Sequence, residues 1–417
     1  MHSNNSPKKV AIIGGGAAGF FSAIHIRKLS GNQVGVVLFE KSPNILTKVR
    51  ISGGGRCNVT HSCFSPEDLA KNYPRGGKEL RYAFELFQPK DTIDWFSNKG
   101  VKLKTELDGR IFPVTDNSET IVNCLLGEAK SLNVSIRTKV PITGIYPAQN
   151  GAGFIVKWEG NEENFDKVLI ASGSSRKVWE WAANLGHKIE PPVPSLFTFE
   201  IDSVLLEGLS GLSVSDVEIS LPDFKLKQRG PLLVTHWGLS GPAVLKLSAW
   251  GARELFDSDY RTTVLLDLIP NISREDLRSE LQKRKLEFPN RKPESRSEFG
   301  LPSRLWERLW GLVLKGEKRW SEVSSKDLHE MVESLKRYSF QMKGKGLFKE
   351  EFVTCGGVRR KEINFQTMES KIIPGLYFAG EALDIDGITG GFNFQNAWTT
   401  GYIAALGICG LEPMKIS

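Results

Sequence analysis

The segment Lys9–Gly19, KVAIIGGGAAG, constrains the fold of this 417-residue chain more than any other stretch. Its apolar start, Val10–Ile13, predicts a buried strand, and an apolar helix is expected from about Ala17 to Leu29. Three glycines join the two in the spacing G-x-G-x-x-G: Gly14, Gly16 and Gly19. In such a turn the first glycine makes the bend, the second lets the backbone approach a pyrophosphate, and the third lets helix and strand pack closely. The segment therefore predicts a dinucleotide-binding turn, with phosphates at the helix N-terminus around Ala17 and Ala18.

A second predicted strand, Val34–Phe39, ends in Glu40, which lies 21 residues after Gly19. An acidic residue at the end of this strand can bond the hydroxyls of a ribose. We therefore expect Glu40, with its neighbour Lys41, to belong to the cofactor site. The alternative is an ordinary glycine-rich connection, but strand, spacing, helix and acid all fall where nucleotide binding requires them.

Another glycine-rich stretch follows at 48–61, KVRISGGGRCNVTH. Consecutive glycines tolerate positive φ angles and let the backbone lie against a ligand, and an adjacent arginine offers donors suited to phosphate. We interpret this stretch as a cofactor-contacting loop rather than a merely flexible one. Its predicted contacts are Lys48, Ser52, Gly54, Gly55, Arg56, Cys57 and Asn58. Because no second cysteine is near in sequence, Cys57 is interpreted as a packed small residue rather than a redox thiol.

The last part of the chain supplies a second end for the cofactor. Leu376–Ala379 predicts a strand that stops at Gly380, where Glu381 or Asp384 can bond sugar hydroxyls. Gly390 and Gly391 then open a helix whose N–H groups would stabilise the negative charge of a reduced isoalloxazine ring. NAD does not need this second end, so the two ends together predict FAD. No second nucleotide-binding unit is present, so NAD(P)H is expected only as a transient electron donor.

The order of the predicted elements indicates an α/β fold with an insertion. Strands, helices and a small antiparallel meander, turning at Asn150-Gly151, precede a buried strand over 167–173. The end of that strand, Ser172-Gly173, is placed in the cofactor site. Short β-like runs over 195–270 and mostly helical segments over 273–340 follow. We expect a FAD-binding domain formed by 1–192 and 346–417, with a substrate domain at 193–345 inserted into it.

Several of these motifs carry a family resemblance: GGGAAG, SGGGRCN at 52–58, GRIFP at 109–113, THWGLSGPAVL at 235–245 and GEALDIDGITGGFNFQNAWTTG at 380–401. They resemble the aminoacetone-oxidase and BaiN-like flavoproteins, also called YhiN-type NAD(P)/FAD-dependent oxidoreductases. The resemblance implies a glutathione-reductase-type, Rossmann-like FAD domain interrupted by an insertion. It also implies FAD contacts at Val140 and at the turn that contains Phe392, Asn393 and Gln395. It does not fix the substrate.

The motif THWGLSGP is the best candidate for chemistry within the insertion. Ser240 is expected to cap a helix whose first turn contains Pro242. His236, just before it, can act as a general acid or base facing the flavin. The alternative is that His236 bonds only to backbone and holds the insertion in place. No spacing of His and Cys predicts a metal site.

Composition restricts the class of protein further. Five scattered cysteines without a C-x-x-C pair favour a reducing cytoplasm, and no apolar run is long enough for a membrane span. The net charge of +7 has local basic runs, such as 283–296, but charge runs are usually solvated faces. We therefore predict a FAD-dependent oxidoreductase of a small molecule and do not favour a nucleic-acid partner. A flavoprotein acting on RNA through the basic insertion, and a non-catalytic FAD-binding regulator, are the alternatives; the oligomeric state is not predicted.

Overall fold

The computed structural model describes residues 9–31, 33–148, 153–314, 316–346 and 353–412. The chain divides into two compact units, Met1–Pro192 with Thr354–Ser417, and Val193–Val353. The sequence analysis expected domain boundaries at 192/193 and 345/346. The first boundary of this division is also 192/193, and the second is 353/354. The chain leaves the first unit in β11 (Ile189–Ser195) and returns in β19 (Val353–Val358), and these two strands pair.

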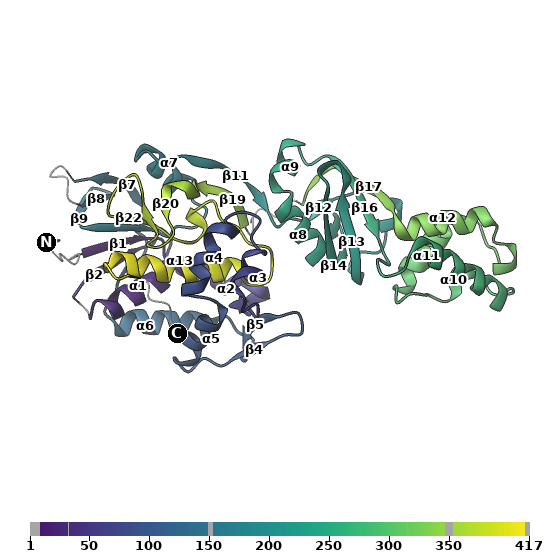
Figure 1. Ribbon diagram of the computed structural model, residues 1–417, viewed down its shortest axis with the longest axis horizontal. Coiled ribbons are helices and arrows are strands. Elements are labelled where there is room, and N and C mark those ends of the chain that lie inside the picture. Colours follow the sequence, from purple (N-terminus) through teal and green to yellow (C-terminus); the bar gives the residue numbers. More distant parts are fainter. Residues whose placement is uncertain (1–8, 32, 149–152, 315, 347–352, 413–417) are drawn as a thin grey trace. The chain divides into compact units, whose positions relative to one another are not determined.

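A seven-stranded sheet forms the centre of the first unit (Figure 1). Its parallel part contains β22 (Leu376–Phe378), β10 (Lys167–Ile170), β1 (Lys9–Ile13), β2 (Gly35–Phe39) and β6 (Ser135–Arg137), in that order. Two short antiparallel strands, β20 (Ile363–Asn364) and β21 (Glu369–Ser370), extend one edge. Two of the seven strands come from the first 40 residues and three from the C-terminal segment, so distant parts of the sequence meet in one sheet. The predicted α/β fold is confirmed.

Two helices from opposite ends of the chain pack side by side in this unit, α1 (Ala17–Leu29) and α13 (Phe392–Ile408), as Figure 1 shows. Ser22 Oγ donates to the Gly401 carbonyl at 3.0 Å. A Cβ on Gly401 would lie 3.0 Å from the Ala18 carbonyl oxygen, so the small residue permits this close approach. The contact brings the two glycine-rich helix starts into one structural unit.

Smaller elements surround this sheet. The remaining helices of the unit are α2 (Thr47–Gly55), α3 (Pro66–Ala70), α4 (Gly77–Leu86), α5 (Pro89–Ser97), α6 (Glu119–Ser131) and α7 (Arg176–Asn184). A three-stranded sheet contains β3 (Thr60–His61), β5 (Arg110–Pro113) and β4 (Leu103–Thr105). The expected meander is present as β7 (Ile142–Pro147), β8 (Phe154–Trp158) and β9 (Asn161–Phe165). Its predicted turn at Asn150-Gly151 lies outside the described residues.

The second unit combines a seven-stranded sheet with helices. The strands run in the order β17 (Tyr338–Met342), β16 (Thr262–Asp267), β13 (Ser213–Leu221), β14 (Leu226–Thr235), β15 (Gly238–Ser240), β12 (Phe199–Glu200) and β18 (Gly344–Lys345). The helices are α8 (Pro242–Trp250), α9 (Ala252–Asp257), α10 (Arg274–Glu287), α11 (Ser303–Leu314) and α12 (Ser325–Lys336). The prediction of helix up to about residue 340 is wrong at its end. There β17, which alternates buried and exposed residues, pairs with β16 and returns the chain to the sheet.

Caps and cores explain the helices of the second unit. Ser273 caps α10, because its hydroxyl accepts the Asp276 N–H. The buried faces of α11 and α12 contribute Trp306, Trp310 and Met331 to one continuous core with the sheet. No helix among the described residues has both the length and the apolar character needed to cross a membrane.

Candidate active site

The first glycine turn has the geometry that dinucleotide binding requires. Gly14 has φ +117°, and a Cβ there would collide with the Ala171 carbonyl next to Ser172. A Cβ on Gly19 would collide with the Gly14 carbonyl. By contrast, no atom lies within 4 Å of a Cβ built on Gly16. The outer glycines are therefore required by packing, whereas the space beside Gly16 is open to a ligand at the start of α1.

Glu40 is held at the end of β2 by backbone groups of the adjacent turns. One carboxylate oxygen accepts the Gly15 N–H and the other accepts the Ser42 N–H, each at 2.9 Å. The Glu40 carbonyl accepts the Val140 N–H at 3.0 Å. Lys41 is exposed beside it. These bonds fix the carboxylate against the glycine turn, in the place expected of a ribose ligand.

The two predicted ends of the cofactor site meet at an ion pair. Lys48 Nζ lies 2.5 Å from Glu381 Oε2. Glu381 follows Gly380, whose φ of +65° and closeness to Ala18 place it beside the start of α1. A Cβ on Gly173 would lie 3.5 Å from the same Glu381 oxygen. Residues predicted from four separate segments are thus neighbours in the first unit.

The stretch at 48–58 is partly helical, which differs from the expected loop. α2 begins at Thr47, but Ser52 has ψ 150° and Gly53, Gly54 and Gly55 all have positive φ. The glycines therefore break the helix and turn the chain back on itself, as positive φ predicts. Cys57 follows with φ +62° and is fully buried. Burial raises the pKa of its thiol to about 12, which disfavours a reactive thiolate at neutral pH.

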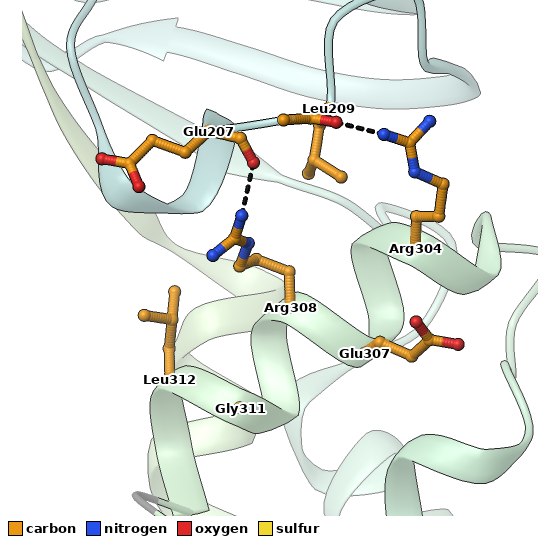
Figure 2. Close-up of a pocket in the computed structure, with 8 residues that line it drawn as sticks. Glu207, Leu209, Arg304, Glu307, Arg308, Gly311 and Leu312 are labelled. Atoms are coloured by element: carbon orange, nitrogen blue, oxygen red, sulfur yellow. Dashed lines mark hydrogen bonds between the residues drawn. The ribbon is translucent and has the colours of Figure 1, made fainter.

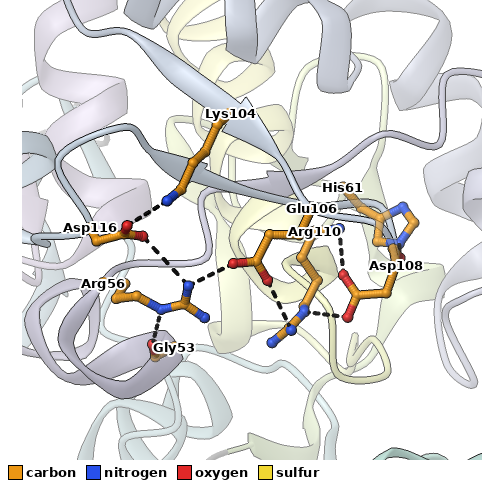
Figure 3. A network of polar contacts seen from close by, with 8 residues as sticks. All are labelled: Gly53, Arg56, His61, Lys104, Glu106, Asp108, Arg110 and Asp116. Carbon is orange, nitrogen blue, oxygen red and sulfur yellow. Dashed lines mark hydrogen bonds and ion pairs between the residues drawn. The ribbon is translucent and has the colours of Figure 1, made fainter.

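Arg56, a predicted cofactor contact, binds acidic side chains of the protein (Figure 3). It pairs with Glu106 at 2.6 Å and Asp116 at 3.5 Å, and it stacks 4.0 Å from the Phe112 ring centroid. Arg110 adds a second bond to Glu106. Both carboxylates bind Nη1 of Arg56, which thus ties the 48–58 stretch to the β4–β5 hairpin. Sequence spacing did not reveal these acidic partners.

The N-terminus of α13 is the second helix start of the predicted site. Gly391 is its N-cap residue and no side chain caps the helix, so the N–H groups of the first turn lack intrahelical partners. With its amide oriented to satisfy both groups, Asn58 accepts the Gly391 N–H and donates to the Thr60 carbonyl, each at 3.0 Å. The Phe392 ring stacks on His61 at 4.8 Å between centroids. His61, to which the sequence analysis gave no role, therefore lies beside this helix start.

Three polar residues predicted near this helix have side chains engaged by protein groups. Gln395 is fully buried and binds Thr60 at 2.6 Å and Thr92 at 2.9 Å. Asn393 bonds the backbone N–H and carbonyl of Gly387. Asp384 is 5% exposed and pairs with Arg360 at 3.1 Å. These side chains therefore hold the loops around α13.

A buried ion pair that the sequence analysis did not single out fixes the loop before α13. Arg75 binds Asp386 with two guanidinium nitrogens, and the Asp386 side chain is fully buried. The pair joins the segment before α4 to the 380–391 loop, and the same two residues also form a backbone β-bridge. Only the fold brings these residues, separated by 311 positions, together.

In the second unit, His236 lies in a tight turn between β14 and β15. Its side chain is exposed, and no hydrogen bond to its imidazole is found within the described ranges. The expectation that Ser240 caps α8 is wrong: Gly241, with φ +95°, is the N-cap, and Ser240 pairs in β15. Ser240 Oγ instead accepts a bond from Thr198 at 3.0 Å.

A pocket of about 480 Å³ in the second unit contains none of the predicted residues (Figure 2). Arg304 and Arg308 line it from α11 and donate to the carbonyls of Gly208 and Glu207. Glu207 and Glu307 also line the pocket, so acidic and basic groups are mixed there. We interpret the two arginines as ties between α11 and the turn after the 3-10 helix at 204–206.

Together, the open space at Gly16, the ribose-type carboxylate of Glu40 and two uncapped helix starts in one unit fit a long dinucleotide. The described residues contain no group of three or more His, Cys, Asp or Glu side chains placed to hold a metal ion. The parallel sheet and this site define the class of protein, a flavoprotein with a Rossmann-type FAD domain. The profile of the HI0933-like protein Rossmann domain matches residues 8–407, and the chain belongs to that family. This confirms the family predicted from the motifs, and the protein is a FAD-dependent oxidoreductase.

Two curated relatives match nearly the full chain. The ribosomal RNA dihydrouridine synthase of Escherichia coli K12 is 30% identical over 407 residues, covering 94% of this chain and 96% of the relative. The 3-dehydro-bile acid delta(4,6)-reductase of Clostridium scindens is 26% identical over 412 residues, covering 95% and 98%. Among solved structures, the 3-ketosteroid-delta4-(5alpha)-dehydrogenase of Rhodococcus jostii RHA1 has a TM-score of 0.51 at 15% identity, covering 97% and 96% of the two chains. This last similarity shows the fold.

Proposed function

We propose that this protein reduces a carbon–carbon double bond conjugated to a carbonyl group, with NAD(P)H as the source of electrons. The names of two full-length relatives support this reaction. Dihydrouridine is uridine with its C5–C6 bond saturated beside the C4 carbonyl. A 3-dehydro bile acid with delta(4,6) unsaturation likewise has double bonds conjugated to its ketone. One chemistry, hydride addition to the far carbon of an enone and proton addition to the near one, covers both.

Bound FAD would supply the hydride through flavin N5. The chain would contribute binding and electrostatics: the α1 N-terminus for the pyrophosphate, Glu40 for a ribose, and Lys48 with Glu381 between the two cofactor ends. The uncapped α13 N-terminus would favour negative charge on the ring. The contacts of the described residues in the first unit support each of these roles.

For the substrate, we propose uridine in ribosomal RNA. The supporting observation is that two relatives with this name, from Escherichia coli and Haemophilus influenzae, are each 30% identical over almost their whole lengths. A small enone, the substrate class favoured by the sequence analysis, is the second candidate and is supported by the bile acid reductase relative.

The distribution of charge between the two units does not favour RNA binding through the inserted unit. The inserted unit, 193–353, contains 25 Lys and Arg against 24 Asp and Glu, so it is almost neutral. Within it, Arg284 and Lys292 of the basic run pair with Glu287 and Glu317. Most of the +7 net charge belongs to the first unit. The proposal therefore does not rely on a basic insertion, which was the premise of the RNA alternative.

His236 is our proposed proton donor. Hydride addition leaves an enolate that must be protonated, and an imidazole is suited to this at neutral pH. The exposed side chain in a turn fixed by β14 and β15 is accessible to a substrate. The alternative role, in which His236 only bonds backbone, has no such bond to support it in the described residues.

The test is an anaerobic reaction of the FAD-loaded protein with NADPH or NADH, followed by either of two substrates. One is ribosomal RNA lacking dihydrouridine, and the other is a 3-oxo-Δ4 steroid. We expect the nucleotide to bleach the flavin and the RNA to restore its colour, with dihydrouridine detected by mass spectrometry. Recovery with the steroid alone would select the small-molecule candidate. If neither substrate reoxidises the flavin, the proposed reaction is contradicted. If neither nucleotide bleaches the flavin, NAD(P)H is not the electron donor, and the non-catalytic alternative is supported.

A further inference from the structure

Trp237 is exposed at the tip of the β14–β15 turn. All ten tryptophans lie in the described ranges, and the other nine are buried or half-buried. The Trp237 side chain, in contrast, is 48% exposed. Exposing so large an apolar ring forgoes the free energy that its burial would give. Tryptophan in such a place is typical of a residue that contacts a ligand.

The turn that carries Trp237 is fixed by hydrogen bonds on both sides. The Trp237 N–H donates to Thr235 Oγ1 at 3.3 Å, and its carbonyl accepts the Ile201 N–H at 2.9 Å. Gly238 has φ +138°, and a Cβ there would collide with the Phe199 carbonyl. The backbone is therefore already ordered before any ligand binds, which lowers the entropic cost of contact.

The surroundings of the turn suit a planar group on an anionic chain. His236 precedes Trp237 and is also exposed, so a ring and a hydrogen-bonding imidazole are adjacent. Residues 231–240 contain no acidic side chain. On the neighbouring strand, Glu200 pairs through its backbone with Gly238 and is half-buried, and Asp202 is paired with Lys343 at 2.9 Å. The turn itself therefore has no carboxylate that would repel a phosphodiester.

We propose that the Trp237 indole stacks on a nucleobase of the RNA substrate. This inference rests on the proposed function, and it assigns the Thr235–Gly238 turn to substrate recognition. Proteins that read unpaired RNA stack splayed bases on aromatic side chains, and one such stack typically changes affinity by about 5- to 100-fold. A flat indole on an ordered turn can make this contact without a basic surface around it.

The test measures RNA binding separately from catalysis. The FAD-loaded protein is titrated into a fluorescently labelled, uridine-containing single-stranded RNA at fixed salt, and anisotropy gives Kd. Trp237→Ala should raise Kd by about 5- to 100-fold, while Trp237→Phe should keep most of the affinity. The matched control is Phe256→Ala, which removes a ring of 49% exposure from α9 in the same unit and should leave Kd unchanged. Thermal unfolding and flavin content confirm that each variant is folded.

A second probe isolates stacking from charge. An abasic oligonucleotide of the same length retains the phosphates but offers no base, so Trp237→Ala and the wild-type protein should bind it equally. Equal RNA affinity of Trp237→Ala and wild type would overturn the inference, as would an equal loss on the abasic probe. If the wild type reduces uridine in RNA while Trp237→Ala binds normally, only this inference fails. If the wild type neither binds nor reduces RNA but reduces the steroid, both the proposed RNA substrate and this inference are wrong.

Discussion

Lys48 and Glu381, 333 positions apart in the sequence, form an ion pair with Nζ 2.5 Å from Oε2. The lysine comes from α2 near the N-terminus, and the glutamate from the 3-10 turn after β22, near the C-terminus. Their contact joins the two ends of the predicted cofactor site. Because the Lys48 side chain is half exposed, the pair adds little to stability by itself.

We predict that Lys48→Met separates cofactor binding from folding. The unfolding free energy of the apoprotein should change by less than about 1 kcal/mol, as for other exposed pairs. The Kd for FAD should rise about tenfold, since a charge-assisted contact is worth roughly 1.5–3 kcal/mol. Flavin fluorescence titration and urea unfolding measure the two effects. Lys130→Met, at an exposed position on α6, is the control, and equal FAD affinity of Lys48→Met and wild type would contradict the role given to Lys48.

The glycine turn permits a sharper comparison, between Gly16→Ala and Gly19→Ala. Gly16 has φ −93° and open space around it, so alanine fits the apoprotein and its thermal midpoint should hardly change. The added methyl would instead occupy ligand space and weaken FAD binding at least tenfold. At Gly19 the methyl would collide with the Gly14 carbonyl and should cost about 1–3 kcal/mol of stability. The site assignment would be wrong if Gly16→Ala retained FAD normally.

Much of the fold and part of the site follow from local sequence patterns. The strand–glycine–helix start, the interrupted α/β domain and the helix after Gly390-Gly391 depend on short-range periodicity and glycine spacing, which a sequence displays directly. The ion pairs of Arg56 could not be predicted in this way, because the carboxylates that bind its Nη1, Glu106 and Asp116, lie 50 and 60 positions away.

Other features depend on tertiary contacts that no spacing encodes. The Ser240 cap expectation failed because Ser240 is drawn into a strand pairing with Leu233. The stack of His61 on Phe392 and the Arg75–Asp386 pair each require the C-terminal loop to fold against the early part of the chain. Conversely, Trp237 was visible in its motif, but its exposure could not be read from residue type, because tryptophan is usually well buried.

Acid should destabilise the protein through His25. This residue is buried against Trp95 and Tyr402, and burial lowers its pKa from 6.5 to about 4. Because the pKa of this histidine is lowered in the folded state, folding favours its neutral form. Its contribution to the free energy of unfolding is therefore fully present above pH 6.5 and is lost as pH falls toward 4. The loss is at most about 3 kcal/mol. Burial also lowers the pKa of His187, which adds to the effect in the same direction.

The check for His25 is urea unfolding at pH 7.5 and pH 5. In His25→Gln the difference between the two pH values should shrink, although the variant is less stable at both because its ring packing is lost. His329→Gln, at an exposed position on α12, should keep the wild-type pH dependence. An unchanged pH dependence in His25→Gln would assign the acid sensitivity to other groups.

Thiol chemistry should not involve Cys57. Its pKa of about 12 and complete burial predict that it resists alkylation in the folded protein at pH 8. The half-buried Cys63 is more accessible and should be modified first. Peptide mapping after iodoacetamide treatment distinguishes the two. Cys57→Ser should also be reduced by NAD(P)H at the wild-type rate, and a large loss of that rate would revive a redox role for this thiol.

His236→Gln provides the sharpest test of the proton donor, because the two half-reactions can be measured separately. Reduction of the flavin by NAD(P)H needs no proton transfer to the substrate, so its rate should stay within about twofold of wild type. Reoxidation by the unsaturated substrate should slow by about 10²- to 10⁴-fold, the usual contribution of a general acid. Stopped-flow absorbance measures both rates. Equal slowing of the two half-reactions would instead indicate that His236 positions the inserted unit, and an unchanged reoxidation rate would move the search for the donor to His61, beside the start of α13.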